Sequence, residues 1–332
     1  MNNLNTKYDE IIKRQGLLEV QVNGIKEPAP VFALENYRKA FNKFLLGETI
    51  KDALKEGSDG SGGYLVPNEF ENQIISCLEE ENVLRKISNV ITTSHDLKIP
   101  GVVNNGSATW ISEGEKIEES DDAFGQIVIR AYKIGTSIKV SDELIEDSAF
   151  DIEKYISETF AHRIGKTEED GFLNGTGIGQ PKGLLLDATV GTLTETSGKI
   201  TLDDVINLFH SVGGRYRASG ILLMNSKTFR LLYKEKGAFG QNIWEPSLEK
   251  DVPTKLLGKP VIICDSMPDP ESFSKPVLFG DFSYYWIGDR GNRSIKRLNE
   301  LYAKNGQVGF LTSQRVDAKL TQPEAIKSLQ VR

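Results

Sequence analysis

Residues 147–183 read DSAFDIEKYISETFAHRIGKTEEDGFLNGTGIGQPKG. Side chains on one helix face recur here at intervals of three and four residues, and the apolar ones among them form a single stripe. The recurring positions are Ile152, Tyr155, Ile156, Thr159, Phe160, Arg163, Ile164 and Thr167. The pattern predicts a helix from about Ser148 to about Asp170, roughly 30 Å long at 1.5 Å per residue. A long helix with one narrow apolar stripe is typical of a strut that lies across a sheet.

Both ends of this helix have sequence signals. Ser148, with Asp151 three residues later, is a start signal because the serine oxygen can accept one of the unpaired N–H groups. Gly171 and the glycines that follow it predict the end of the helix. Two oppositely charged pairs lie one turn apart and support it, Lys154 with Glu158 and Lys166 with Asp170.

The composition limits the function. The chain has 332 residues, enough for two domains, with 26% charged residues and a net charge of -7. The net negative charge argues against a surface that binds nucleic acid through phosphate contacts and counterion release. No apolar run reaches the 18 or so residues of a membrane span, and no secretory signal is visible. Cys77 and Cys264 lie in apolar surroundings and are expected to be reduced and buried.

A glycine- and serine-rich stretch, EGSDGSGGYLVP, runs from Glu56 to Pro67. It predicts a mobile linker followed by an ordered, extended arm, because Pro67 disfavours helix at Val66. An ordinary interdomain linker is the alternative. Helical patterns flank this stretch at residues 34–54, where Gly47 interrupts the pattern, and at residues 68–87.

Residues 99–140 predict a long two-stranded ribbon. A short strand at 108–111 leads into a polar tip at 113–122, and residues 126–140 then alternate over more than the usual strand length. A ribbon of this kind cannot bury itself, so it needs a partner surface, which in an oligomer belongs to a neighbour. The alternative is an ordinary hairpin on a sandwich domain.

Residues 186–285 read as strands alternating with helices, which predicts a compact α/β module. Strands are expected at 184–186, 191–193, 199–200, 220–225, 259–264 and 277–280, and helices at 202–210 and 227–236 with Thr201 and Ser226 as caps. Later strands are expected at 284–290, 294–298, 301–302 and 309–316, with alternation on to Leu320.

Three pieces of the chain carry a resemblance. They are the helix end FLNGTGIGQPKGL at 172–184, the arm GGYLVP at 62–67 and the late strand QVGFLTSQRVDAK at 307–319. Over residues 58–332 the chain resembles the HK97-type major capsid proteins of tailed bacteriophages. The resemblance implies an α+β fold of the HK97 capsid type, with an N-terminal arm, an E-loop β-ribbon, a peripheral domain with a long spine helix, and an axial α/β domain.

The resemblance also implies a division of the chain. The parts are residues 1–57 (an N-terminal extension and candidate reduced scaffold segment), 58–94 (N-terminal arm and start of the peripheral domain), 95–140 (E-loop ribbon), 141–185 (peripheral domain with the spine helix), 186–285 (axial domain) and 286–332 (return strands of the peripheral domain and a C-terminal end in the axial domain).

The implied function is structural. Identical subunits form the hexamers and pentamers of an icosahedral head that encloses double-stranded DNA without sequence-specific binding. The other implied partners are a portal protein and a scaffold or maturation protease. Assembly takes place in the bacterial cytoplasm, the product is the virion, and no membrane is involved. An encapsulin-like nanocompartment shell of the same fold is the alternative.

No catalytic, cofactor-binding or metal residues are expected. The glycines 175, 177 and 179 follow a helix instead of a strand, so they do not place a pyrophosphate on a helix N-terminus. Neither a Walker A lysine nor a nucleophile elbow is present, which disfavours a hydrolase or nucleotide-binding enzyme built on residues 186–285. The acidic tip at 113–122 lacks EF-hand spacing and is expected to be solvated. His162 is expected to be a surface or helix-packing residue.

The resemblance raises two processing steps that occur in the capsid family. Some members form a lysine–asparagine crosslink near the E-loop tip, but the setting of Lys116 does not match that pattern, so noncovalent assembly is predicted. Cleavage near Glu56–Ser61, which would remove the N-terminal extension, is a hypothesis.

Overall fold

The computed structural model describes residue 41 and residues 43–47, 58–59, 63–65, 68–104, 123–146, 151–236, 244 and 254–332. The chain divides into two compact units, residues 1–57 and residues 58–332. In the first unit, residues 43–46 are helical, and Leu45 is buried. Gly47 has a φ of 86° and ends this helical segment, as its position in the sequence pattern predicts.

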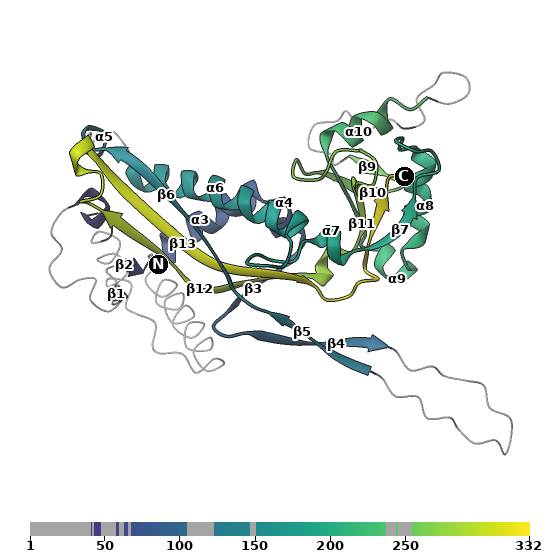
Figure 1. Cartoon of the computed structure of the whole chain (residues 1–332), viewed down its shortest axis with the longest axis horizontal. Coiled ribbons are helices and arrows are strands. Elements are labelled where there is room, and N and C mark those ends of the chain that lie inside the picture. Colours follow the sequence, from purple (N-terminus) through teal and green to yellow (C-terminus); the bar gives the residue numbers. More distant parts are fainter. Residues whose placement is uncertain are drawn as a thin grey trace, which may run out of the picture. The chain divides into compact units, whose positions relative to one another are not determined.

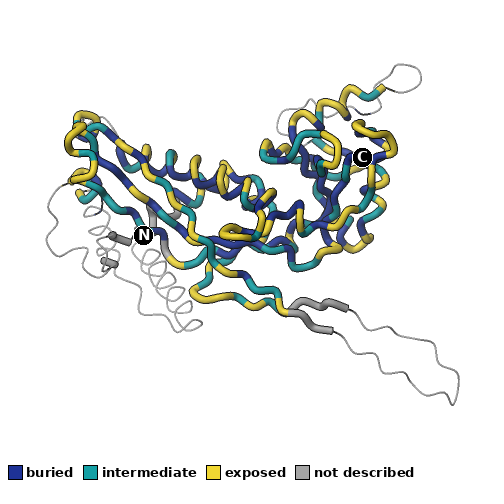
Figure 2. Tube along the Cα trace, in the orientation of Figure 1, coloured by how far each residue is buried: buried dark blue, intermediate teal, exposed yellow. Residues whose placement is uncertain are grey.

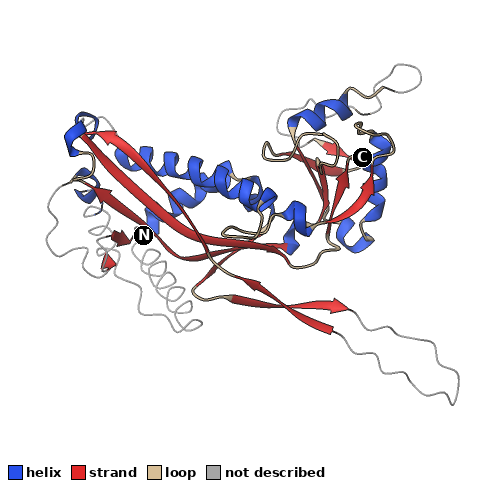
Figure 3. Ribbon diagram, viewed as in Figure 1, coloured by secondary structure: helices blue, strands red, loops and turns tan. Residues whose placement is uncertain are grey.

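Six strands of the second unit form the sheet on which the long helix lies (Figures 1 and 3). They are β1 (Ser58–Asp59), β2 (Gly63–Leu65), β3 (Asn89–Thr93), β6 (Tyr132–Ser141), β12 (Tyr285–Leu298) and β13 (Gln307–Leu320). Their order is β1-β2-β12-β13-β6, and β3 pairs with β12 in parallel. β13 therefore lies between β12 and β6, with an antiparallel partner on each side.

The turn between β12 and β13 replaces a predicted strand. Residues 301–302 are a turn, followed by the 3₁₀-helix η3 (Ala303–Asn305) and by Gly306 at a φ of 61°. The prediction was wrong because the chain reverses direction here. Gly306 adopts the left-handed backbone conformation that this reversal needs, at little cost in free energy because it has no Cβ.

The long helix is α6, Ile152–Asn174, and both predicted ends were wrong. Its N-cap is Asp151, whose side chain accepts the N–H of Lys154 at 3.0 Å, so the helix starts after Ser148. Gly171 remains helical, and its carbonyl accepts the N–H of Gly175 at 3.1 Å. A single glycine costs a helix interior only about 1 kcal/mol, which packing readily outweighs.

One side of α6 is buried along its length, as Figure 2 shows. The predicted stripe is confirmed for Ile152, Ile156, Phe160 and Ile164, whereas Tyr155 is exposed. The neighbouring helix α3 (Asn68–Glu81) approaches closely at Gly165, where an added Cβ would lie 3.1 Å from Cβ of Glu81.

The helix predicted over residues 68–87 is in fact two helices. α3 ends at Glu81, and α4 (Val83–Ile87) starts after Asn82. The Asn82 side chain caps α4 by accepting the N–H of Arg85 at 3.2 Å. Asparagine favours this non-helical cap position, so it breaks the pattern that its apolar neighbours continue. A further short helix, α5 (Asp142–Glu146), follows β6.

The second sheet also has six strands. They are β7 (Thr189–Leu193), β8 (Ile221–Met224), β9 (Lys255–Leu256), β10 (Lys259–Ile263), β11 (Val277–Gly280) and β14 (Ile326–Gln330). The order is β7-β14-β11-β8-β10-β9, with β8 parallel to β10 and β7 parallel to β14. The uniformly apolar strands β8 and β11 lie in its centre, as their sequences require.

Five short helices of the described chain lie around this sheet, and three local predictions in this region were wrong. The helices are α7 (Leu184–Asp187), α8 (Leu202–Ser211), α9 (Gly214–Arg217), α10 (Ser226–Tyr233) and the 3₁₀-helix η2 (Phe282–Tyr284). Residues 184–186 are helical and residues 199–200 lie in a loop, so the strands predicted there were wrong. Thr201 caps α8, as predicted, and Asp204 completes a capping box that was not predicted from the sequence. The cap of α10 is Asn225 and not Ser226, because its amide oxygen accepts the N–H of Thr228 at 2.8 Å.

The described part of the ribbon consists of β4 (Leu97–Asn104) and β5 (Ala123–Ile129), which pair only with each other (Figure 1). The single strand predicted over residues 126–140 is two strands. The break comes at Arg130, whose N–H donates to the Asp317 carboxylate at 2.7 Å. Residues 132–141 then join the six-stranded sheet, so the ribbon ends before the limit of 140 that the resemblance implied. The predicted strand at 108–111 and the tip at 113–122 lie outside the described residues.

One cluster of buried apolar side chains spans the second sheet, the C-terminal turn of α6 and the start of β12. Phe172 and Tyr285 contact each other at its centre, with ring centroids 6.4 Å apart. The Tyr285 hydroxyl donates to the carbonyl of Phe172 at 3.1 Å, which satisfies a polar group that would be costly to bury unpaired.

Candidate functional site

The charged side chains inside the second unit form a network that the sequence did not predict, which we call the buried charge cluster (Arg85, Glu168, Asp289, Arg293 and Gln314). Arg85 is its centre. Nε of Arg85 donates to Oε2 of Glu168 at 2.8 Å, and Nη2 donates to Oε1 of Glu168 at 3.0 Å. The same guanidinium donates to both oxygens of Asp289, at 3.0 and 2.8 Å. Two bidentate pairs therefore share one arginine.

Two further residues complete the cluster. Arg293 donates to the amide oxygen of Gln314 at 2.6 Å and to Asp289 at 3.3 Å. The amide nitrogen of Gln314 donates to Glu168. The cluster thereby joins α4, α6, β12 and β13 through side chains alone. Every carboxylate oxygen in it has a donor, which is the condition under which buried charges hold a structure together.

Burial and charge act against each other in this cluster. Burial raises the pKa of the Glu168 carboxyl, and the guanidinium of Arg85 opposes that shift. At Asp289 burial also acts to raise the pKa, but Arg85 outweighs it, so the pKa lies below its ordinary value. Burial acts to lower the pKa of Arg85, and the two carboxylates more than offset it. Arg85 is therefore a permanent cation, held by acids on two different elements.

A second carboxylate of α6 continues the network. Glu169 accepts the N–H of Val83 at 2.8 Å and the hydroxyl of Ser266 at 2.9 Å. Cys264 lies beside it, and burial together with the Glu169 charge raises the pKa of the thiol to about 12. Glu169 thus connects α6 to the start of α4 and to the turn after β10, and burial together with the Glu169 charge keeps Cys264 protonated.

The sequence held one signal for this cluster. Glu168 follows Phe160 and Ile164 at four-residue spacing, so it lies on the buried stripe where a glutamate is out of place. An acid on an apolar stripe predicts a buried cation as partner. Nothing local pointed to Arg85 or Asp289 as that partner, because they lie 83 and 121 positions away and adjoin Glu168 only in the folded chain.

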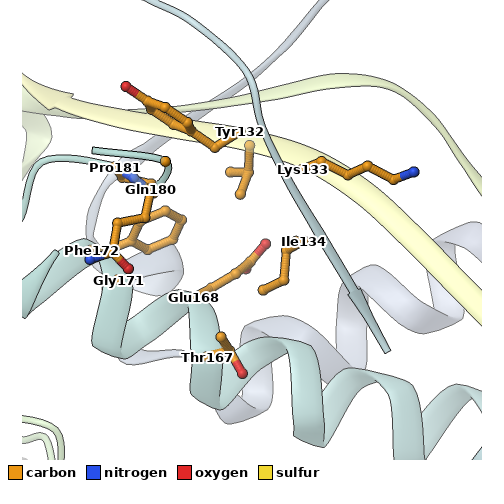
Figure 4. A pocket seen from close by; sticks show the side chains of 11 residues that line it. Tyr132, Lys133, Ile134, Thr167, Glu168, Gly171, Phe172, Gln180 and Pro181 are labelled. Atoms are coloured by element: carbon orange, nitrogen blue, oxygen red, sulfur yellow. The ribbon is translucent and has the colours of Figure 1, made fainter. Parts of the chain in front are cut away.

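A cavity of about 200 Å³ lies next to the cluster, between α6, β6 and the loop after α6 (Figure 4). Its walls are mainly apolar and come from Tyr132, Ile134, Phe172, Pro181 and Val316. Figure 4 shows Glu168 extending from α6 toward this space, whereas the Lys133 side chain extends away from it. The carboxylate of Glu168 already accepts hydrogen bonds from Arg85 and Gln314.

The glycine-rich loop that lines this cavity has a packing role. A Cβ at Gly175 would lie 2.2 Å from the carbonyl oxygen of Pro181, and one at Gly183 would lie 2.4 Å from the carbonyl oxygen of Leu173. Gly177 and Gly179 have φ values of 80° and 71°. The glycines let the chain fold back on the end of α6, which explains their spacing without a phosphate ligand.

The other residues singled out in the sequence are placed as follows. His162 is exposed on α6, and its Nδ1 lies 2.9 Å from Oε2 of Glu81 on α3; both side chains line an open cleft of about 620 Å³. Cys77 and Cys264 are free thiols, and Cys77 is only half-buried. Lys116 and the acidic tip lie outside the described residues.

Among the residues that the structure describes, no group of three or more His, Cys, Asp or Glu is arranged to hold a metal ion. No helix in that part of the chain is long and apolar enough to cross a membrane.

Comparison with known proteins gives relatives of one kind. The chain is 20% identical over 251 residues to the major capsid protein of Klebsiella oxytoca phage phiKO2, covering 71% of this chain and 58% of that protein. It is 25% identical over 178 residues to the major capsid protein of Escherichia phage T5, covering 52% of this chain and 35% of that protein. The chain therefore matches less than two thirds of the length of these curated relatives.

Solved structures share the fold. The chain is similar to a structure described as the capsid of a native GTA particle computed with C5 symmetry, with a TM-score of 0.67 and 28% identity over 75% of this chain and 89% of that one. A structure from Mycobacterium phage Cain matches with a TM-score of 0.58 over 89% of this chain and 98% of that one, at 16% identity, which bears on the fold alone. The α+β fold of the HK97 capsid type is thereby confirmed. The sequence pattern of the phage capsid family matches residues 62–331, and this chain belongs to that family.

Proposed function

We propose that this chain is the major capsid protein of a tailed phage. Its copies assemble as hexamers and pentamers into an icosahedral shell that encloses double-stranded DNA. The family match over residues 62–331 carries the proposal. The similarity to the GTA particle capsid, over 89% of that chain, supports it independently.

The described architecture suits a shell subunit. The ribbon of β4 and β5 has no third strand in the described chain, and two strands alone are marginally stable in water. A neighbouring copy supplies the missing surface. The buried charge cluster gives the subunit internal stiffness, because it ties α4, α6, β12 and β13 together.

We propose the following assignment of residues to domains. Residues 58–94, 141–185 and the return strands after residue 285 form the peripheral domain, and residues 186–285 with the C-terminal strand form the axial domain. A portal protein and a scaffold or maturation protease act with it, and assembly takes place in the host cytoplasm before the particle becomes a virion. The function is structural and requires no cofactor.

Electron microscopy of the purified protein tests the proposal. Closed shells or hexameric and pentameric rings are expected, and a strictly monomeric protein at high concentration would contradict it. The contents of shells purified from cells distinguish the two shell types. Double-stranded DNA supports a phage head, whereas a protein cargo supports an encapsulin-like compartment.

Two finer proposals have simple tests. The subunits are held noncovalently, so boiled shells give no band above the 36.9 kDa position of the full-length monomer on a denaturing gel, and a ladder above it would show covalent crosslinks. Cleavage near Glu56–Ser61 removes the N-terminal extension during maturation. Mass spectrometry of mature particles that finds residues 1–57 intact would contradict this cleavage.

A further inference from the structure

One edge of the second sheet carries neither charged side chains nor prolines, which are two of the usual protections against pairing with another chain. β7 is its terminal strand, and its sequence TVGTL contains no charge and no proline. Val190 and Leu193 on this strand are 42% and 44% exposed. Soluble proteins blunt such edges with lysines, prolines, bulges or very short strands, because an open edge is a template for another strand. β7 has a bulge between Val190 and Thr192, where its register with β14 shifts, but Thr192 and Leu193 beyond the bulge pair regularly with β14.

The backbone of β7 is oriented for pairing. Thr194 N–H donates to the carbonyl of Gln330 at 3.0 Å, so residues 192 and 194 direct their polar groups toward β14. Successive residues of a strand point these groups to opposite sides, which directs the N–H and C=O of Leu193 away from the sheet. Leu193 therefore presents a donor, an acceptor and an apolar side chain at the same edge.

In the described ranges of the chain, another strand covers only part of the opposite edge of the sheet. β9 pairs with Lys259 and Pro260 of β10 and extends no further along that strand. Cys264 N–H donates to the carbonyl of Met224 on β8 at 2.9 Å, whereas Val261 N–H donates outward to the carbonyl of Thr254 at 2.8 Å. By the same alternation, Ile263 directs its N–H and C=O outward, beyond the end of β9. Its side chain is 37% exposed.

We propose that β7 of one copy pairs through Leu193 with the outer edge of β10 at Ile263 in a second copy. The inference rests on the proposed function and names the contact that joins neighbouring subunits within a ring. The two edges lie on opposite sides of one sheet, so the contact is heterologous, and a closed ring satisfies every edge. Backbone hydrogen bonds supply the attraction, and the uncharged side chains at both edges permit close approach.

A cross-linking experiment tests the pairing directly. The variant carrying both Leu193→Cys and Ile263→Cys is assembled and treated with a short bifunctional thiol reagent, since residues directly opposite each other across paired strands have Cβ atoms about 5 Å apart. We expect a ladder of linked subunits on a denaturing gel. The two single variants are the controls and keep the native cysteines, so neither should give the ladder. Assembled shells of the double variant that give no ladder overturn the proposal.

Charge placed on the edge provides a second measurement. Leu193→Lys is expected to raise the lowest protein concentration that yields shells by at least about tenfold, because the lysine must be desolvated in the interface. Leu257→Lys is the matched control, since Leu257 is 40% exposed in the turn between β9 and β10 and lies off the proposed contact. Thermal unfolding of the unassembled subunits should be the same for both variants.

These measurements separate the inference from the function on which it rests. Equal assembly of the wild type, Leu193→Lys and Leu257→Lys overturns the pairing and leaves the shell function in place. A wild-type protein that forms neither rings nor shells overturns both. Slower hydrogen exchange at the Leu193 amide in the assembled particle than in the subunit, with the Leu257 amide unchanged, is the expected spectroscopic signature.

Discussion

Nε of Arg85 lies 2.8 Å from Oε2 of Glu168, and the two side chains are 2% and 0% exposed. This pair joins the short helix α4 to the long helix α6. The other side of the same guanidinium holds Asp289 on β12. A single cation thus connects three elements that the sequence keeps far apart, and its removal would leave two buried carboxylates without their main partner.

Replacing this arginine should destabilise the subunit severely. Arg85→Met is expected to lower the free energy of unfolding by about 3–5 kcal/mol, because an uncompensated buried charge remains. Chemical denaturation of the unassembled subunit measures the loss. Lys154→Met is the control, since it breaks the exposed pair with Glu158 at 3.8 Å and should cost less than about 1 kcal/mol. Equal effects of the two changes would contradict the role assigned to Arg85.

The lowered pKa of Asp289 predicts a loss of stability in acid. The folded pKa lies below the unfolded value of about 3.9, so the contribution of Asp289 is fully present above that value. It is lost as the pH falls through the folded pKa. We expect the difference in unfolding free energy between the wild type and Asp289→Asn to be constant above about pH 5 and to shrink below about pH 4. Urea denaturation across this range measures it, and a difference that grows in acid would refute the assignment.

The loop after α6 should not tolerate a side chain at its first glycine. A Cβ on Gly175 would lie 2.2 Å from the Pro181 carbonyl oxygen and 2.3 Å from that of Gly171, and both are backbone atoms. Gly175→Ala is expected to cost at least about 2 kcal/mol. Gly214→Ala is the matched control, because Gly214 is helical and has nothing within 4 Å of an added Cβ. That variant should be neutral or slightly stabilised in thermal unfolding.

The two thiols should differ in reactivity. With a pKa of about 12, only roughly one Cys264 thiol in ten thousand is ionised at pH 8, and the group is also buried. Burial, and then the charge of Glu80, also raise the pKa of Cys77, but this thiol is half-buried. We expect a maleimide to label Cys77 slowly and Cys264 only in denaturant, as read by mass spectrometry of the peptides. Labelling of Cys264 in the native subunit would contradict the environment described.

The helix break at Asn82 should be sensitive to the loss of its amide. Asn82→Ala removes the acceptor for the Arg85 N–H at 3.2 Å and a weaker bond to the Gly165 carbonyl at 3.5 Å. The expected cost is about 1–2 kcal/mol in chemical denaturation. Asn82→Asp keeps the cap acceptor and should recover part of this loss. A fully stable Asn82→Ala variant would show that the break between α3 and α4 does not depend on this cap.

Sequence patterns predicted the elements whose burial repeats at a fixed period. The stripe of Ile152, Ile156, Phe160 and Ile164 predicted α6, and the apolar runs predicted β8, β10 and β11, because each pattern reflects one buried face or a fully buried strand. Thr201 predicted the start of α8, since an N-cap acts on the helix residues that directly follow it. The alternation over residues 126–140 hid a break, however, because the Asp317 carboxylate that holds Arg130 comes from another strand.

By itself the sequence determined the main helices and strands, such as α6, α8, β8, β10 and β11, and, through three short motifs, the family to which the chain belongs, because these depend on neighbouring residues. Only the tertiary structure decided which charges meet inside the molecule and which sheet edges stay open. Arg85, Glu168 and Asp289 lie on separate elements, and β7 is an edge only because β14 returns from the end of the chain to pair on its other side. Interactions between distant segments depend on how the chain closes, and no local pattern records that.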